Sequence, residues 1–143
     1  MLKLQIKYHS KEIEKIKKIE KGDWIDLRSA ETVNLKAGQF KLISLGISMK
    51  IPEGYEAHIA PRSSTFKTWH ILQTNSIGVV DNSYSGNNDI WMMPVYATQD
   101  CTISVNDRIC QFRIMEKMPE INFEEVDNLE GPDRGGIGST GTN

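Results

Sequence analysis

Apolar and polar residues alternate along much of the chain with a period of two. In LKLQIKY, residues 2–8, every second side chain is apolar, which is typical of a half-buried strand and not of a helix. Further runs rich in strand-forming residues follow: FKLISLGISMKI (40–51), YEAHIA (55–60), IGVV (77–80), DIWMMPVYA (89–97), CTISV (101–105) and RICQFRIM (108–115). Turn sequences such as AGQ, PEG and VND separate these runs, so the pattern predicts an all-β sandwich or barrel.

Two segments carry a different pattern. SSTFKTWHIL, residues 63–72, favours a short helix. KEIEKIKKIEK, residues 11–21, spaces its isoleucines three apart, which suits a helix, but its position after a strand also allows an extended arm. The sequence leaves both alternatives open for this second segment.

The composition changes after about Val126, where acidic residues give way to the glycine-rich end GPDRGGIGSTGTN. We therefore divide the chain into a β-sandwich domain, residues 1–126, and a flexible C-terminal arm, residues 127–143. The arm offers almost nothing apolar to bury, so its composition predicts disorder. It also combines Arg134 with glycines and short hydroxyls, which are groups suited to holding phosphate.

Composition and charge narrow the function. A length of 143 residues suffices for one domain with its own core. The formal net charge of −2 provides no overall positive field, so we expect no non-specific nucleic-acid binding. Cys101 and Cys110 lack the spacing of a metal or redox motif, and the N-terminal stretch lacks the apolar run of a signal peptide or membrane span. We expect a cytoplasmic protein with no membrane attachment.

Five short stretches hold polar residues that a plain β-sandwich does not need. In GDWIDLRSAE (22–31), Asp26 stands between strand-forming apolar residues, so it lies on the surface or faces a cation. Taken alone, this acid favours the surface position. In APRSST (60–65), a proline sets up a turn that presents Arg62, Ser63 and Ser64 together, as an anion site requires, although such turns are also common on protein surfaces.

The third stretch, NSIGVVDNSYSGNN (75–88), combines glycines with Asp81 and Tyr84. It predicts a hairpin whose exposed backbone can bind the edge of a flat ligand; an ordinary hairpin whose turn begins at Asp81 is an equal alternative. In the fourth, NDRICQFRI (106–114), Arg108 and Gln111 interrupt an apolar strand, a pattern typical of an edge strand. The fifth is RGGIGSTG, residues 134–141.

In this order, the five stretches resemble the five motifs of the homotrimeric dUTPases. The most specific are PRSS, NSIGVVDNSYSG and RGGIGSTG. The resemblance implies a jelly-roll-like (β-clip) fold, a homotrimer with three shared active sites, a Mg²⁺ ion, and hydrolysis of the substrate dUTP to dUMP and pyrophosphate. It also implies that the arm crosses to a site built by other subunits and closes over the nucleotide, ordering only on binding.

The resemblance gives roles to the residues that match each motif. Asp81 is the general base that activates water, and Asp26 acts through water on the Mg²⁺ that the phosphates chelate. Tyr84 lies against the deoxyribose, where a 2′-hydroxyl would collide with it. The other expected contacts are Ser63, Ser64, Gln111, Arg134, Ser139 and Thr140 with phosphate, Arg62 with phosphate or with Asp26, Asn75, Gly78, Val79 and Val80 with uracil, and Ile137 and Gly138 in the closing arm.

The chain departs from the family pattern at several positions. Ile137 stands where an aromatic residue usually stacks on uracil; Trp91 is the nearest substitute, with a core position as its alternative. Ser85 and Ile77 replace the more common arginine and proline, which points to a bacterial or phage branch.

Two other functions stay open at this point. One is a dCTP deaminase of the same fold, which would need a glutamate base where the pocket offers Asp81. The other is a regulatory nucleotide-binding protein whose arm controls contact with a protein partner.

Overall fold

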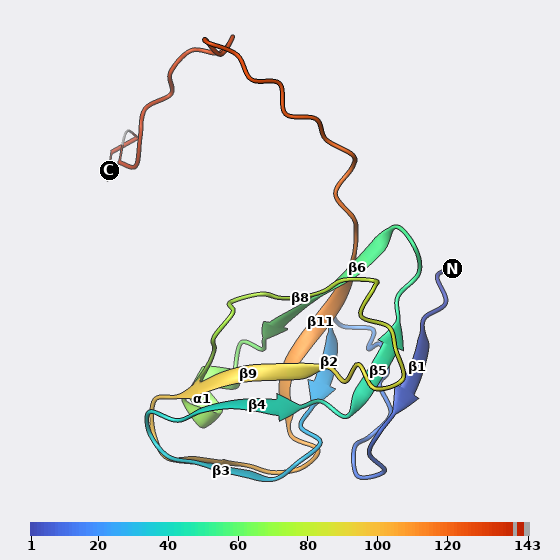
Figure 1. Ribbon diagram of the computed structural model, residues 1–143. Coiled ribbons are helices and arrows are strands. Elements are labelled where there is room, and N and C mark those ends of the chain that lie inside the picture. Colours follow the sequence, from blue (N-terminus) through green and yellow to red (C-terminus); the bar gives the residue numbers. More distant parts are fainter. Residues whose placement is uncertain (139, 142–143) are drawn as a thin grey trace.

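The computed structural model describes residues 1–138 and 140–141, and its regular elements are almost all strands (Figure 1). The strands are β1 (Gln5–Tyr8), β2 (Ile25–Arg28), β3 (Val33–Leu35), β4 (Phe40–Ser44), β5 (Ile47–Lys50), β6 (Tyr55–Pro61), β7 (Ile71–Gln73), β8 (Gly78–Val80), β9 (Met92–Ala97), β10 (Cys101–Ile103) and β11 (Arg108–Glu116). A short helix, α1 (Thr65–Trp69), follows β6. The prediction of an all-β fold is confirmed.

The strands form antiparallel sheets that enclose one apolar core. A four-stranded sheet has the order β2-β11-β6-β8, and a three-stranded sheet has the order β4-β9-β7. Two further pairs, β1 with β5 and β3 with β10, complete the pairing among the described residues. In the core, the rings of Trp91 and Phe112 meet edge to face at a centroid distance of 5.3 Å, a favourable aromatic geometry. The arrangement agrees with the jelly-roll-like sandwich that the sequence predicts.

The predicted helix at residues 63–72 is too long. Helix α1 ends at Trp69, and His70 follows with a positive φ of 56°. A left-handed residue at this position ends a helix, and Ile71 then begins β7 as a fully buried strand residue. Tertiary burial of Ile71 in a sheet outweighs the local helical preference here.

Residues 11–21 form an extended arm, so the helical alternative for this segment is wrong. Ile13 is buried in the core, and the backbone N–H of Ile16 donates to the hydroxyl of Tyr8 at 2.8 Å. Glu14 forms an ion pair with Arg28 at 2.9 Å. Residues 11–21 are therefore held against the sandwich by a buried side chain, a hydrogen bond and an ion pair.

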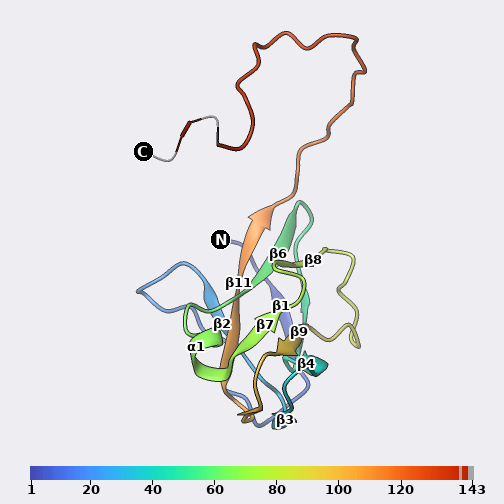
Figure 2. The ribbon, with the colours of Figure 1, turned by 90° about the vertical axis from the view of Figure 1, so that its left-hand side faces the viewer.

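The C-terminal part of the chain leaves the sandwich where β11 ends. Described residues from Lys117 onward are exposed, and both views show this segment leading away from the body (Figures 1 and 2). The division between domain and arm at residue 126 stays a prediction.

Two smaller features complete the fold. Cys101 and Cys110 are free thiols, and complete burial raises the pKa of Cys110 far above that of an exposed thiol. In the part of the chain that the structure describes, no helix has the length and apolar character needed to cross a membrane.

Candidate active site

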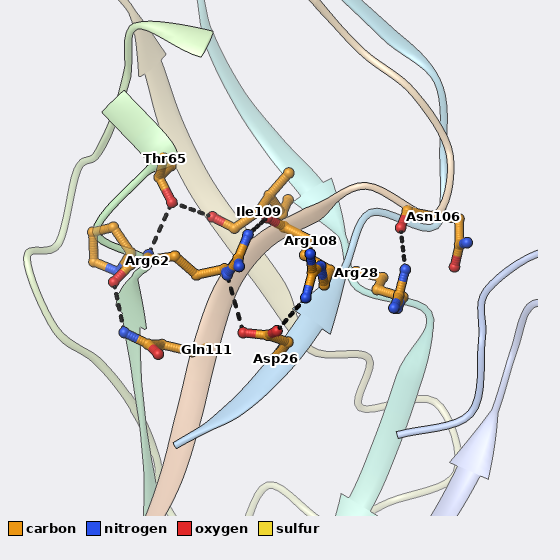
Figure 3. Close-up of polar contacts among 9 residues, drawn as sticks. Asp26, Arg28, Arg62, Thr65, Asn106, Arg108, Ile109 and Gln111 are labelled. Atoms are coloured by element: carbon orange, nitrogen blue, oxygen red, sulfur yellow. Dashed lines mark hydrogen bonds and ion pairs between the residues drawn. The ribbon is translucent and has the colours of Figure 1, made fainter. Parts of the chain in front are cut away.

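Polar side chains meet where β2, β11 and the end of β6 lie side by side (Figure 3). The carboxylate of Asp26 on β2 lies 3.0 Å from Nε of Arg62 and 3.3 Å from Nη1 of Arg108. Gln111 on β11 donates its amide N–H to the carbonyl of Pro61 at 3.0 Å. We call Asp26, Arg62, Arg108 and Gln111 the arginine cluster. Its guanidinium and amide groups suit the binding of an anion such as phosphate.

A β-bulge sets the direction of Arg108. The register with β2 shifts between Arg108 and Cys110, so β11 contains an extra residue at this point. In a regular strand, side chains three apart point to opposite faces; the bulge instead puts Arg108 and Gln111 on the same side as Asp26. Ile109 and Cys110 between them are both fully buried.

Two expectations about these strands change in the structure. The edge-strand interpretation of Arg108 and Gln111 is wrong, because β11 lies between β2 and β6. Asp26 is not a plain surface acid, since its side chain is only 24% exposed and faces two cations. The pairing with Arg62 is the second of the two roles that the sequence left open for that arginine. Arg108 was not among the predicted site residues, although two apolar residues in a row beside it are a sign of a bulge.

The turn that carries Arg62 is fixed to β11 through Thr65, which is buried. The backbone N–H of Arg62 donates to Oγ1 of Thr65 at 2.8 Å, and the same hydroxyl donates to the carbonyl of Ile109 at 3.0 Å. Ser63 is exposed in this turn, and Ser64 begins α1 without a side-chain capping bond. Both predicted serines therefore lie beside the arginine cluster.

A second site lies at the opposite edge of the same sheet. Strand β8 and the loop after it border, with β9, a cavity of about 510 Å³, within the usual range of a small-molecule site. Its lining includes the predicted residues Asn75, Gly78, Val79, Val80, Asp81 and Tyr84. We call this cavity the edge pocket.

The backbone of the edge pocket is not the hairpin that the sequence predicts. Strand β8 pairs with the earlier strand β6, and β9 belongs to the other sheet. The residues from 81 to 91 form turns and loop. Their many polar turn residues favour a loop over a returning strand.

Asp81 begins a turn at the rim of the edge pocket, as the ordinary-hairpin alternative expected, although the hairpin itself does not form. Its Oδ1 accepts the backbone N–H of Ser83 at 2.8 Å. Hydrogen bonds from Ser83, together with the positive charge of Lys117, lower the pKa of Asp81 below its ordinary value of 3.8. The carboxylate is therefore ionised at neutral pH and can accept a proton.

Gly78 and Tyr84 shape the walls of the edge pocket. A side chain at Gly78 would meet Cβ of Ile59 at 3.3 Å and Nδ2 of Asn75 at 3.4 Å, so glycine allows a close approach here. The hydroxyl of Tyr84 donates to the carbonyl of Ile90 at 2.9 Å and holds the half-exposed ring at the pocket.

Trp91 is a core residue and does not replace the missing aromatic of the arm. Its side chain is 1% exposed and packs on Phe112. Met92, the next residue, is 41% exposed and lines the edge pocket. Sequence reasoning missed Met92, although alternation along β9 already turns it away from its buried neighbours.

The arginine cluster and the edge pocket do not meet within one chain. Strands β11 and β6 lie between β2, which carries Asp26, and β8, which precedes Asp81. Neighbouring strands are about 4.8 Å apart, so three spacings, roughly 14 Å, separate the backbone of β2 from that of β8.

The predicted residues of the arm lie at neither site. Arg134 and Thr140 are exposed, and Ile137 is fully exposed. Gly138 has a positive φ of 85°, a conformation that favours glycine. Ser139 lies outside the described residues.

The arginine cluster offers a single carboxylate for a metal ion. Among residues 1–138 and 140–141, no three His, Cys, Asp or Glu side chains come together as a metal site. Both oxygens of Asp26 already face guanidinium groups. A single carboxylate fits a Mg²⁺ ion that is bound mainly by water and by the oxygens of a phosphate, as is usual for this ion.

Comparisons with known proteins identify a family and a close relative of this chain. Residues 12–142 match the sequence model of a family described as dUTPase. The SPbeta prophage-derived deoxyuridine 5'-triphosphate nucleotidohydrolase YosS of Bacillus subtilis strain 168 is 56% identical over 141 residues, which cover 99% of each chain.

Solved structures share the fold. A Staphylococcus bacteriophage 80alpha dUTPase with dUpNHpp has a TM-score of 0.81 at 20% identity, covering 99% of this chain and 100% of the other. A dUTPase from phage phi11 of S. aureus, which coordinates a structural Mg(II) ion, has a TM-score of 0.75 at 19% identity, covering 91% of this chain and 100% of the other.

Proposed function

This chain belongs to the dUTPase family, and we propose that its arginine cluster and edge pocket together hydrolyse dUTP to dUMP and pyrophosphate. The observation that carries the proposal is the presence, on one sheet, of a cationic turn suited to phosphate and a pocket bordered by the ionised Asp81. The relative of 56% identity, a deoxyuridine 5'-triphosphate nucleotidohydrolase, supports it.

Asp81 acts as the general base in this proposal. It takes a proton from a water molecule whose oxygen attacks the α-phosphorus. As the new P–O bond forms, the bond from the α-phosphorus to the bridging oxygen breaks, and pyrophosphate leaves with the electron pair. The carboxylate of Asp81 is ionised at neutral pH and can accept the proton, and a positioned base typically contributes about 10²–10⁴-fold to the rate.

The arginine cluster and its turn bind the triphosphate. The exposed hydroxyl of Ser63, the neighbouring Ser64 and the amide of Gln111 supply hydrogen bonds, and Arg62 supplies charge beside them. Arg134 of the arm adds a bidentate guanidinium suited to the terminal phosphate. Ser139, Thr140, Ile137 and Gly138 complete the closing arm.

The edge pocket selects the base and the sugar. Asn75 and the backbone of Gly78, Val79 and Val80 present polar groups to the edge of uracil, and cytosine would leave some of them unpaired. The ring of Tyr84, fixed by its hydrogen bond to Ile90, lies against the deoxyribose and leaves no room for a 2′-hydroxyl. The pocket therefore discriminates against UTP, which carries a 2′-hydroxyl.

Asp26 helps to hold Mg²⁺ through water at the arginine cluster. When bound, the ion neutralises charge on the phosphate oxygens. Asp26 has a hard oxygen donor and is itself held in place by Arg62. The Mg(II) of the phi11 dUTPase supports the choice of ion.

The active form is a homotrimer with shared sites. With roughly 14 Å between the backbones of β2 and β8, Asp81 of one chain lies away from a phosphate held at its own arginine cluster. A second copy can supply the missing half, and the exposed arm of a third can close over it. Light scattering at micromolar concentration should give the mass of three chains; a monomer would contradict this assembly.

Incubation with dUTP, dCTP and Mg²⁺, followed by separation of the products, tests the activity. We expect dUMP and pyrophosphate from dUTP and no change in dCTP. Conversion of dCTP to a uracil nucleotide would support the deaminase, and binding of dUTP without turnover would support a purely regulatory role. A regulatory protein partner stays a prediction.

A further inference from the structure

Asp26 is bracketed by two guanidinium groups, and the proposed chemistry uses only one of them. Arg62 approaches Oδ1 at 3.0 Å and Arg108 approaches Oδ2 at 3.3 Å. The side chain of Arg108 is 49% exposed, about twice the 23% of Arg62. The side chain of Arg108 is therefore partly open to solvent.

The bulge in β11 turns the side chain of Arg108 toward Asp26. Without the extra residue between Arg108 and Cys110, Arg108 would point into the core and away from Asp26. Bulges disrupt strand pairing and are enriched next to active sites, where they redirect a side chain. The carbonyl of Arg108 also accepts a hydrogen bond from Nη1 of Arg62 at 3.1 Å, so the backbone at the bulge positions both arginines.

Charge balance shows what Arg108 adds. Asp26 and Arg62 alone form a neutral pair, because one negative and one positive charge cancel. A triphosphate approaching that pair would gain little attraction and would meet the carboxylate as a like charge. With Arg108 the three side chains carry one negative and two positive charges, a net charge of +1, and the site attracts anions.

We propose that Arg108 is a positioning residue that holds Asp26 and keeps the arginine cluster net positive for the triphosphate. The inference rests on the proposed function, because it requires the triphosphate to bind at this cluster. It makes the bulge at Ile109 a functional feature of the sheet.

Binding of α,β-imido-dUTP in the presence of Mg²⁺, measured by titration calorimetry, tests this role. Arg108→Gln should raise the Kd by about 10- to 100-fold, the range expected when one charge-assisted interaction is lost, while dUMP binding changes far less. Arg108→Lys keeps the charge and should recover most of the affinity. Arg113→Gln is the matched control, since Arg113 lies on the same strand and pairs with Asp23 outside the cluster.

A charge-matched double variant separates charge balance from simple contact. Asp26→Asn with Arg108→Gln restores the net charge of +1 but also removes the carboxylate assigned to Mg²⁺, so this pair of variants is compared without Mg²⁺. Under that condition the double variant should bind the imido analogue more tightly than Arg108→Gln alone. Thermal melting of each variant establishes that it folds. If the double variant binds as weakly as Arg108→Gln, or if Arg108→Gln binds like the wild type, the inference is overturned.

Hydrolysis of dUTP by the wild-type protein distinguishes this inference from the proposed function. Wild-type turnover with an unchanged Kd for Arg108→Gln rejects the role of Arg108 and leaves the proposed function standing. Absence of wild-type turnover rejects the proposed function itself.

Discussion

The arginine cluster and the edge pocket lie on the same sheet but are built in different ways. The cluster joins two neighbouring strands and a turn through ion pairs and hydrogen bonds, with the buried hydroxyl of Thr65 beneath it. The edge pocket is formed by a three-residue edge strand and a loop, and its Asp81 is exposed. The charges of the cluster are held by several strands, whereas the carboxylate of Asp81 lies where another chain can approach it.

Under the proposed function, the arginine cluster holds the triphosphate, whereas the edge pocket holds the base and the sugar and supplies the carboxylate of Asp81. Phosphate recognition depends on rigid geometry, because preorganised charges cost no rearrangement when the ligand arrives. The edge pocket instead needs an open side if, as we propose, its carboxylate acts on a phosphate bound at the arginine cluster of another chain. Variants at the two sites should therefore affect different kinetic constants.

The largest effect is expected at the edge pocket. Asp81→Asn should lower kcat by about 10²–10⁴-fold, because the amide cannot accept the proton of water, while Kd for α,β-imido-dUTP stays nearly unchanged. Steady-state kinetics and calorimetry measure the two constants. Asp89→Asn is the matched control, since Asp89 also accepts a backbone N–H in this loop, at 2.8 Å from Gly86; a similar loss there would remove the special role of Asp81.

Removal of the arm should have the next largest effect. Deleting residues 134–143 should lower kcat/KM by about 100-fold, because two or more charge-assisted contacts with phosphate are lost, and should leave the melting temperature unchanged. Gly138→Val should reproduce much of the loss, since valine disfavours the φ of 85° at this position. Unchanged activity would mean that the arm is inert, and a lower melting temperature would mean that it is structural.

A smaller effect is expected at the turn beneath the arginine cluster, and it should leave the edge pocket unaffected. Thr65→Val keeps the shape of the side chain but leaves the N–H of Arg62 and the carbonyl of Ile109 without this partner. The free energy of unfolding should fall by about 1–3 kcal/mol, and KM for dUTP should rise several-fold with little change in kcat. Urea unfolding and steady-state kinetics test this; a drop in kcat alone would show that the turn also controls the edge pocket.

The smallest effect concerns the sugar. Tyr84→Phe removes the hydrogen bond to the carbonyl of Ile90, worth about 0.5–1.5 kcal/mol, and frees the ring to move. The ratio of kcat/KM for dUTP to that for UTP should fall a few-fold. An unchanged ratio would mean that packing alone fixes the ring.

The alternating pattern predicted much of the sandwich, including the short strands β8 and β10, but missed β3 and β7. Strands such as β6 and β11 follow clear runs of strand-forming residues. The three-residue strands β3 and β7 do not, because so few residues show no period. Ile71 had a local preference for the preceding helix, and only burial in the three-stranded sheet places it in β7.

The individual motifs were visible in the sequence, but their grouping was not. PRSS marks a turn, yet only the register of β2 with β11 shows that Asp26 reaches Arg62. The distance between Asp26 and Asp81 depends on strand order, which a sequence does not contain. Arg108 was missed as a site residue because regular alternation would turn it away from Gln111, and the bulge reverses that expectation.

Complementation between two inactive variants tests most directly whether the two sites combine across chains. Asp81→Asn retains a normal arginine cluster, and Arg62→Ala retains a normal edge pocket. Each should be nearly inactive alone at low dUTP concentration. Unfolding the two together and refolding them as mixed assemblies should restore dUTP hydrolysis, because the cluster of one chain meets the edge pocket of the other. A refolded mixture no more active than its parents, with wild-type protein recovering full activity under the same treatment, would contradict the account.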